Sequence, residues 1–253
     1  MIIVRKSEER RHIEKEDHIT WMTFDWENKA DPLQNGFGFL KLLNEEILPP
    51  GSGFILHTHK DMVVVTYVPE GMIIFKGPSE DPNIMESKEF HQVRSEPGAK
   101  VSAFNVSQSE EAHIFQSGFT PNKGPSKSDG VKRLFTHAER QGVLKLVASQ
   151  DGKEGSLPLQ QDVQIYSTFI HKGNHMIHEL KPGRSAWLHV VKGRILLDNL
   201  ALQTGDGAGL SSEMAVSFTA QIPTEILLFD LGKEVLDEIK MGPERKAETA
   251  VTG

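Results

Sequence analysis

Two histidines separated by one residue, His57 and His59, are the side chains of this sequence whose type and spacing point most directly to chemistry. Residues two apart in a β-strand point to the same face, so one strand can direct both imidazoles at a single metal ion. The chain has 11 His and no Cys, which excludes thiol catalysis and thiolate-ligated metals. A metal site must then use His, carboxylates and water. The alternative is a pair of polar residues at a strand end that bind water or main-chain carbonyls.

Length and composition limit the kind of protein that carries this pair. The 253 residues are enough for one large or two modest domains, and 38% hydrophobic with 25% charged residues is typical of a soluble globular protein. A net charge of −7 argues against binding to nucleic-acid phosphates. The charged N-terminal segment is unlike a signal peptide and the apolar runs are too short to cross a bilayer. We therefore expect a cytoplasmic protein that contacts neither nucleic acid nor membrane.

The pattern that must position the histidines is of strand type. Short runs rich in Val, Ile and Phe are interrupted by Gly, Pro, Asn and Asp, with one set within residues 37–118 and a second within 143–230. Many short strands with frequent turns are typical of antiparallel sandwiches or barrels. The sequence therefore predicts an all-β protein made of two similar halves.

A polar, Pro- and Gly-containing stretch near residue 125 separates the two halves. It gives a first domain at 1–122, a linker at 123–130, a second domain at 131–232 and a C-terminal region at 233–253. Within that last region, 233–240 has apolar residues at helical spacing, which predicts a short helix followed by a polar tail.

Two further histidines are candidates to complete a site with the histidine pair. His91 and His113 lie in or beside predicted strands, but a shift of one residue turns a side chain to the opposite face. Their contribution to a site therefore stays open, and a polar residue at a strand end is the alternative. The cluster at 171–178 is interpreted as solvated hairpin histidines, and the acidic pair at 45–46 as part of a solvated loop.

Several short segments, in unbroken order over residues 1–232, resemble the pirin family, which is a branch of the bicupins. The similarity is greatest to the bacterial quercetinase-like members of that family. The segments include Thr23-Phe24, Asp31-Pro32, Asn44-Glu45-Glu46, Pro50-Gly51, His57-Thr58-His59-Lys60-Asp61-Met62, Glu70-Gly71, Gln161-Asp162 and Val190-Val191-Lys192-Gly193. The resemblance implies two tandem antiparallel β-barrels of cupin or jelly-roll type. It also implies a mononuclear metal, usually iron, in the first barrel.

The resemblance also implies a ligand set that this sequence does not complete. The family's first motif falls on His57 and His59, and its later motif, Gly-x-x-His-x-Glu-x-Asn, falls on 98–105. Gly98 and Asn105 are in place, but the ligand positions hold Val101 and Ala103. Val63 occupies the place of the Glu found in the general cupin motif. Substitution by apolar residues predicts a drier pocket without the anionic group that balances the charge of a metal ion.

We therefore expect a pirin-like bicupin with an incomplete metal site formed by His57 and His59, lined by Val101 and Ala103. Its function would be small-molecule binding or regulation, with weak or no dioxygenase activity. The alternative is a quercetin 2,3-dioxygenase-like oxygenase that uses both histidines and a further ligand. No catalytic residue or cofactor is assigned, although iron or another divalent transition metal would suit the pair. The expected partners are a small apolar or flavonoid-like ligand or another protein.

Overall fold

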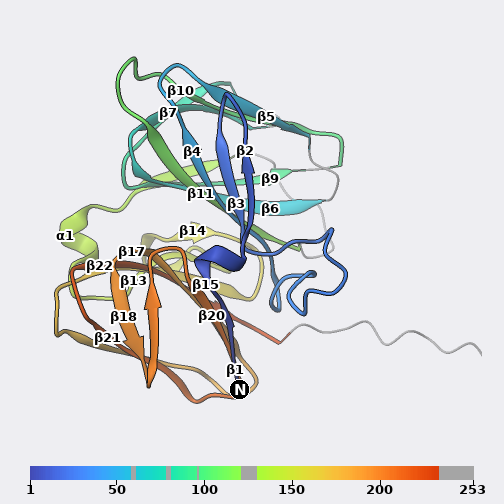
Figure 1. The fold of residues 1–253 in the computed structure, drawn as a ribbon. Coiled ribbons are helices and arrows are strands. Elements are labelled where there is room, and N and C mark those ends of the chain that lie inside the picture. The colour runs from blue at the N-terminus through green and yellow to red at the C-terminus, as the bar shows by residue number, and fades with distance from the viewer. Residues whose placement is uncertain (58–60, 78–80, 96, 121–129, 234–253) are drawn as a thin grey trace, which may run out of the picture.

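The computed structural model describes residues 1–57, 61–77, 81–95, 97–120 and 130–233. Nearly all regular structure is β, arranged as two halves stacked one above the other (Figure 1). Each half contains a seven-stranded and a four-stranded sheet. The all-β prediction with two similar halves is confirmed.

The first half, called the first barrel below, pairs these two sheets around one core. Its seven-stranded sheet has the order β12 (Val131–Leu134), β9 (Glu89–Ser95), β6 (Met62–Glu70), β11 (Ala112–Phe119), β4 (Leu40–Leu48), β3 (Ile19–Met22) and β2 (Arg11–Glu14). Its four-stranded sheet has the order β5 (Gly53–His57), β10 (Lys100–Asn105), β7 (Met72–Lys76) and β8 (Asn83–Glu86).

The second half, called the second barrel, repeats this plan. Its seven-stranded sheet has the order β1 (Ile2–Arg5), β20 (Gly207–Ser211), β17 (Ser185–Lys192), β22 (Thr224–Leu231), β15 (Val163–Ile170), β13 (Lys145–Ser149) and β14 (Leu157–Pro158). Its four-stranded sheet has the order β16 (His175–Glu179), β21 (Ala215–Ala220), β18 (Arg194–Leu197) and β19 (Leu200–Gln203). The pairing of β13 with β14 is parallel, whereas the other pairings between described strands are antiparallel.

The N-terminal strand crosses between the halves. β1 pairs with β20 of the second barrel, whereas β2 and β3, which follow a short 3₁₀ turn η1 (Ser7–Glu9), pair in the first. Figure 1 shows β1 running along the second barrel with the N-terminus at its far end. The first residues thus belong to the sheet of the second barrel, and the domain boundaries drawn from sequence stay a prediction.

Alternation along the strands creates three apolar cores. On β11, Ile114 lies in a core inside the first barrel, and Phe115 lies in a core shared by both barrels. Trp187 and Phe229 of the second barrel join that shared core, and Leu188 and Leu228 form part of a third core inside the second barrel. Both faces of the central strands β11, β17 and β22 are therefore buried. Each large side chain fully buried in this way stabilises the fold by about 1.5–3 kcal/mol.

The described chain contains little helix. The single α-helical turn α1 (His137–Arg140) lies at the seam between the barrels, followed later by the 3₁₀ turn η2 (Lys153–Gly155). Thr136 caps α1, since the Glu139 amide donates to its hydroxyl oxygen at 3.3 Å and the Glu139 carboxylate accepts from its amide at 2.7 Å. Among the described residues, no helix has the length and apolar character needed to span a membrane. The predicted helix at 233–240, the polar tail and most of the predicted linker lie outside the described residues.

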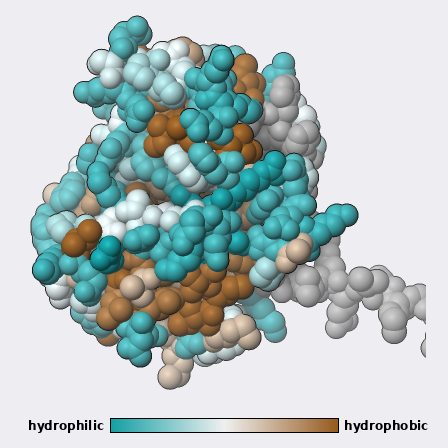
Figure 2. Space-filling model, in the orientation of Figure 1, coloured by the Kyte–Doolittle hydropathy of each residue, from teal (hydrophilic) through white to brown (hydrophobic). Residues whose placement is uncertain are grey.

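Hydrophilic residues cover most of the visible face of the molecule (Figure 2). Hydrophobic residues gather over the second barrel, in the region of β18 and β20. Among the exposed hydrophobic residues of this barrel is Leu196 of β18, which is 37% exposed.

Candidate functional site

The interior of the first barrel is the candidate site, and β10 forms one of its walls. Val101 and Ala103 are 4% and 1% exposed and belong to the core inside this barrel. Ala103 lies opposite Phe54 of β5 and Phe75 of β7, both buried. The two positions at which the family pattern has His and Glu are therefore buried and apolar.

Of the two histidines of the pair, only His57 lies within the residues that the structure describes. His57 is the last residue of β5 and pairs in register with Lys100, whereas Leu56 pairs with Val101. His59 lies outside the described residues. The prediction that His57 and His59 hold a metal is therefore not tested by the structure.

His91 lies inside the first barrel. It is 2% exposed on β9, two residues from Val93, which belongs to the same core as Val101. Its ring lies nearly perpendicular to that of Phe75, with the ring centroids 4.8 Å apart. Burial, and next the positive charge of Lys132, lower the pKa of His91 to about 4, so its imidazole is neutral at pH 7. Sequence phase alone could not decide this orientation.

A buried acid, Glu46, lies on the opposite part of the same interior. It is 3% exposed on β4, pairs in register with Ile114 and accepts a hydrogen bond from the Thr20 hydroxyl. Burial raises the pKa of Glu46 to about 8, so the carboxyl is mostly protonated at pH 7. Gln116 and Thr66, adjacent in register on β11 and β6, are buried as well. The interior thus combines an apolar wall with polar groups that carry little net charge.

The neighbouring acid, Glu45, points to the seam between the barrels. It is bonded to one imidazole and one guanidinium group: Oε1 lies 2.9 Å from His113 Nε2, and Oε2 accepts from Arg10 Nη2 at 2.6 Å. Burial alone would raise the pKa of Glu45, but the His113 hydrogen bond and the Arg10 charge lower it to about 2. The prediction of a solvated loop at 45–46 was wrong, because both residues lie in the buried strand β4.

The position of His113 on β11 directs its side chain away from the interior of the first barrel. Its neighbours Ala112 and Ile114 lie in the core of that barrel, so His113, between them on β11, faces the other way. His189 of the second barrel is fully buried nearby, its ring 5.4 Å from that of Phe115, and its ring nitrogens have no hydrogen-bond partner among the described residues. Burial lowers the pKa of His189 to about 3.

The second barrel places its histidines differently from the solvated hairpin predicted. His171 and His175 are exposed, as expected. His178 is half-buried instead, with Nε2 2.8 Å from Asp230 Oδ2 and its ring 4.7 Å from that of Tyr166. β16 begins at His175, and alternation along it places His178 on the same face as Met176, which packs against the core of the second barrel.

The described residues do not fit the family's metal. Val101 and Ala103 have only carbon in their side chains and lie in a packed apolar core. Among the residues that the structure describes, no three His, Asp or Glu side chains are grouped so that they could hold a metal ion. We therefore derive no reaction step through a metal.

Two tandem antiparallel barrels, with a candidate site inside the first, define a bicupin. Residues 146–231 match the family model described as the quercetinase C-terminal cupin domain. Quercetin 2,3-dioxygenase of Escherichia coli strain K12 is 32% identical over 91% of this chain and 99% of its own length. A pirin-like protein of Caulobacter vibrioides is 26% identical over 82% of this chain and 89% of its length.

Two solved structures are similar to this chain in both fold and sequence. YhhW from Escherichia coli superposes with a TM-score of 0.84 at 31% identity, covering 92% of this chain and 98% of that one. A second structure, of the bacterial pirin YhhW in complex with nickel(II), gives a TM-score of 0.81 at 30% identity, covering 92% of this chain and 100% of that one. The chain belongs to the pirin-like, quercetinase-like family of bicupins.

Proposed function

We propose that this pirin-family bicupin binds a small apolar or flavonoid-like molecule inside its first barrel, in a binding or regulatory role, with weak or no dioxygenase activity. The observation that carries the proposal is the burial of Val101 and Ala103 at the two positions where the family pattern has His and Glu. Neither side chain can ligate a metal or accept a proton from a substrate hydroxyl.

The charge state of the interior supports the same function. Glu46, with a pKa of about 8, and His91, with a pKa of about 4, are both predominantly neutral at pH 7. Two histidines without a carboxylate bind a divalent ion more weakly and less selectively than a complete set. A neutral ligand with apolar surface and a few hydroxyl groups suits such an interior better than an ion does.

Metal content and ligand binding test the proposal together. Protein purified without chelator is analysed for bound metals, and quercetin is titrated against the metal-free protein by fluorescence quenching. We expect well below one metal per chain, saturable quercetin binding and little ring cleavage. One tightly held iron per chain that a His57→Ala variant loses would overturn the metal-poor function.

A second candidate is a quercetin 2,3-dioxygenase-like activity that uses His57, His59 and a further ligand. The name of the relative from Escherichia coli favours it, as does the position of His91 inside the barrel, in contact with Phe75 opposite Ala103. Metal-dependent quercetin cleavage with release of carbon monoxide, abolished by His91→Ala but not by His113→Ala, would support this candidate.

A further inference from the structure

The outer edge of β1 is unpaired. β1 is the last strand of its sheet and pairs only with β20 among the described strands. Met1 and Ser211 exchange both main-chain hydrogen bonds, at 2.7 and 3.0 Å. Since hydrogen-bonded and non-hydrogen-bonded pairs alternate along an antiparallel ladder, Ile3 and Arg5 also bond to β20. The main-chain N–H and C=O groups of Ile2 and Val4 therefore point away from β20.

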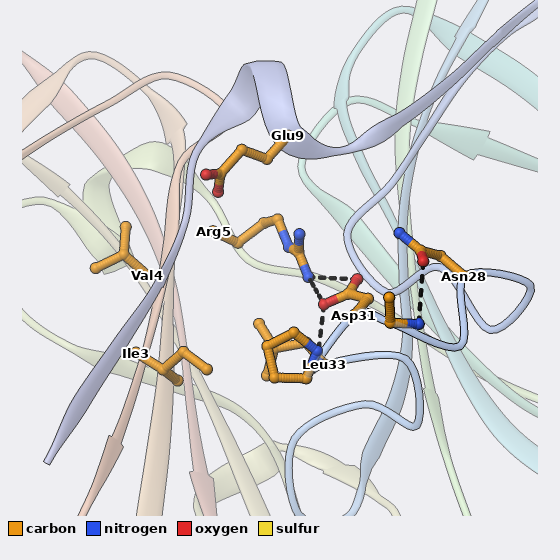
Figure 3. Close-up of a pocket in the computed structure, with 9 residues that line it drawn as sticks. Ile3, Val4, Arg5, Glu9, Asn28, Asp31 and Leu33 are labelled. Atoms are coloured by element: carbon orange, nitrogen blue, oxygen red, sulfur yellow. Dashed lines mark hydrogen bonds and ion pairs between the residues drawn. The ribbon is translucent and has the colours of Figure 1, made fainter.

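A pocket of about 320 Å³ adjoins this edge, between β1, η1 and the loop at 28–33. In Figure 3 the side chains of Ile3 and Arg5 point toward the loop, whereas that of Val4 points away from Arg5 and Asp31. Val4 therefore bounds the pocket through its main chain. A strand added beside β1 would bond to Val4 and could insert a side chain into the pocket.

The polar groups of the pocket select the kind of side chain. Arg5 Nη2 donates to both carboxylate oxygens of Asp31, at 2.5 and 2.6 Å, which leaves Nη1 without a described partner. Glu9 accepts from the Lys6 amide through Oε2 at 2.9 Å, so Oε1 stays available. Arg5, Asp31 and Glu9 together carry one net negative charge, which disfavours a carboxylate. A lysine ammonium has only donors, so it could bond to Glu9 but would leave the Arg5 N–H without an acceptor. A neutral amide can accept from Arg5 and donate to Glu9.

We propose that the edge of β1 binds an extended segment of a partner protein, which pairs with Ile2 and Val4 and places an asparagine or glutamine side chain in the pocket. Main-chain pairing at a free sheet edge supplies affinity, and the adjoining pocket supplies selectivity. This inference is independent of the function proposed for the first barrel.

A second copy of the chain suits this edge less well. If two β1 strands paired antiparallel, the strand added to the edge would be Ile2–Arg5 of the other copy. That strand has no asparagine or glutamine side chain to place in the pocket.

The test uses the full chain and three labelled synthetic peptides. Each alternates threonine and valine and differs only in its central residue, which is glutamine, glutamate or lysine. Binding is measured by fluorescence anisotropy. We expect the glutamine peptide to bind at least fivefold more tightly than the other two, and Glu9→Ala to remove that preference.

Two substitutions at one position isolate the main-chain contact. Val4→Pro removes the outward N–H, which β20 does not use, whereas Val4→Ala keeps it and also shortens the side chain. We expect Val4→Pro to weaken binding at least tenfold, Val4→Ala to bind like the wild type, and both to keep a similar melting temperature. If Val4→Pro does not fold, a glutamine peptide with N-methylated main-chain amides, tested on wild-type protein, must fail to bind.

Three results would overturn the proposal. The first is that none of the peptides binds at millimolar concentration. The second is that Val4→Pro, or the N-methylated peptide, binds as well as its control. The third is a wild-type dimer in light scattering that Val4→Pro converts to a monomer, because a second copy would then occupy the edge.

Discussion

The Tyr67 hydroxyl in the first barrel donates to the Glu225 carboxylate in the second and accepts from Arg140 Nη1 at 2.9 Å. Arg140 also donates to Glu225 at 3.2 Å and is fully buried, so one tyrosine oxygen connects both barrels with α1. Burial, and next the Glu225 charge, raise the pKa of Tyr67 well above its ordinary value, which keeps the hydroxyl a hydrogen-bond donor.

Tyr67→Phe should therefore destabilise the protein by about 1–3 kcal/mol, because it leaves a buried carboxylate and guanidinium each without one partner. Urea unfolding measures this loss. Tyr166→Phe is the control, since its half-buried hydroxyl donates to Gln164 alone and should cost less. Equal losses for both variants would contradict a special role for the connection through Tyr67.

The pKa of Glu46 gives the protein a pH-dependent stability. Burial raises this pKa to about 8 from an ordinary 4.5, so the folded state binds the proton more tightly than the unfolded state. Stability should then fall as pH rises from about 4.5 to 8. Glu46→Gln should remove this fall, which unfolding measurements across that range can check. Identical pH profiles for variant and wild type would disprove the assignment.

Glu45, its neighbour on β4, should behave in the opposite way. Its folded-state pKa of about 2 lies below the ordinary 4.5, so its contribution to stability is present above pH 4.5 and is lost as pH falls toward 2. Glu45→Gln should thus be less stable than the wild type at pH 6, with a difference that narrows in acid. A difference that stays constant down to pH 3 would speak against the bonds to His113 and Arg10 as its cause.

Restoring the two family ligand positions should create metal affinity. The double variant Val101→His, Ala103→Glu adds an imidazole and a carboxylate on one face of β10, beside the strand that ends at His57. We expect iron(II) or nickel(II) binding by calorimetry at least tenfold tighter than in wild type. The control is Val101→Leu with Ala103→Val, which adds bulk without ligands. No gain in affinity would show that the interior has been remodelled beyond these two positions.

Much of the fold could be predicted from sequence, because strand periodicity and turn residues are local signals. The two predicted sets of strands, within 37–118 and within 143–230, correspond to strands such as β6 and β15. The apolar pattern did not predict strand β10. The resemblance to the family motif was the only signal that singled out Val101 and Ala103, which lie on this strand. Both residues are buried in the core inside the first barrel.

The sequence could not place the acids and the remaining histidines, because their orientation depends on tertiary pairing. Glu45 and Glu46 lie within β4 instead of the predicted loop, and a single step along the strand sends one to the seam and the other into the barrel. His91 and His113 differ in the same way. Strand phase, which one residue can invert, decided each case.

The pairing of β1 with β20 has a consequence for how the chain folds during synthesis. Residues 2–5 must wait until 207–211 have been made before they can join their sheet. Such contacts between distant parts of the sequence slow folding, and they leave the N-terminal strand exposed while most of the chain emerges. The second barrel is therefore completed by a strand made long before its partner, and a fragment that begins after residue 5 would lack one strand of that barrel.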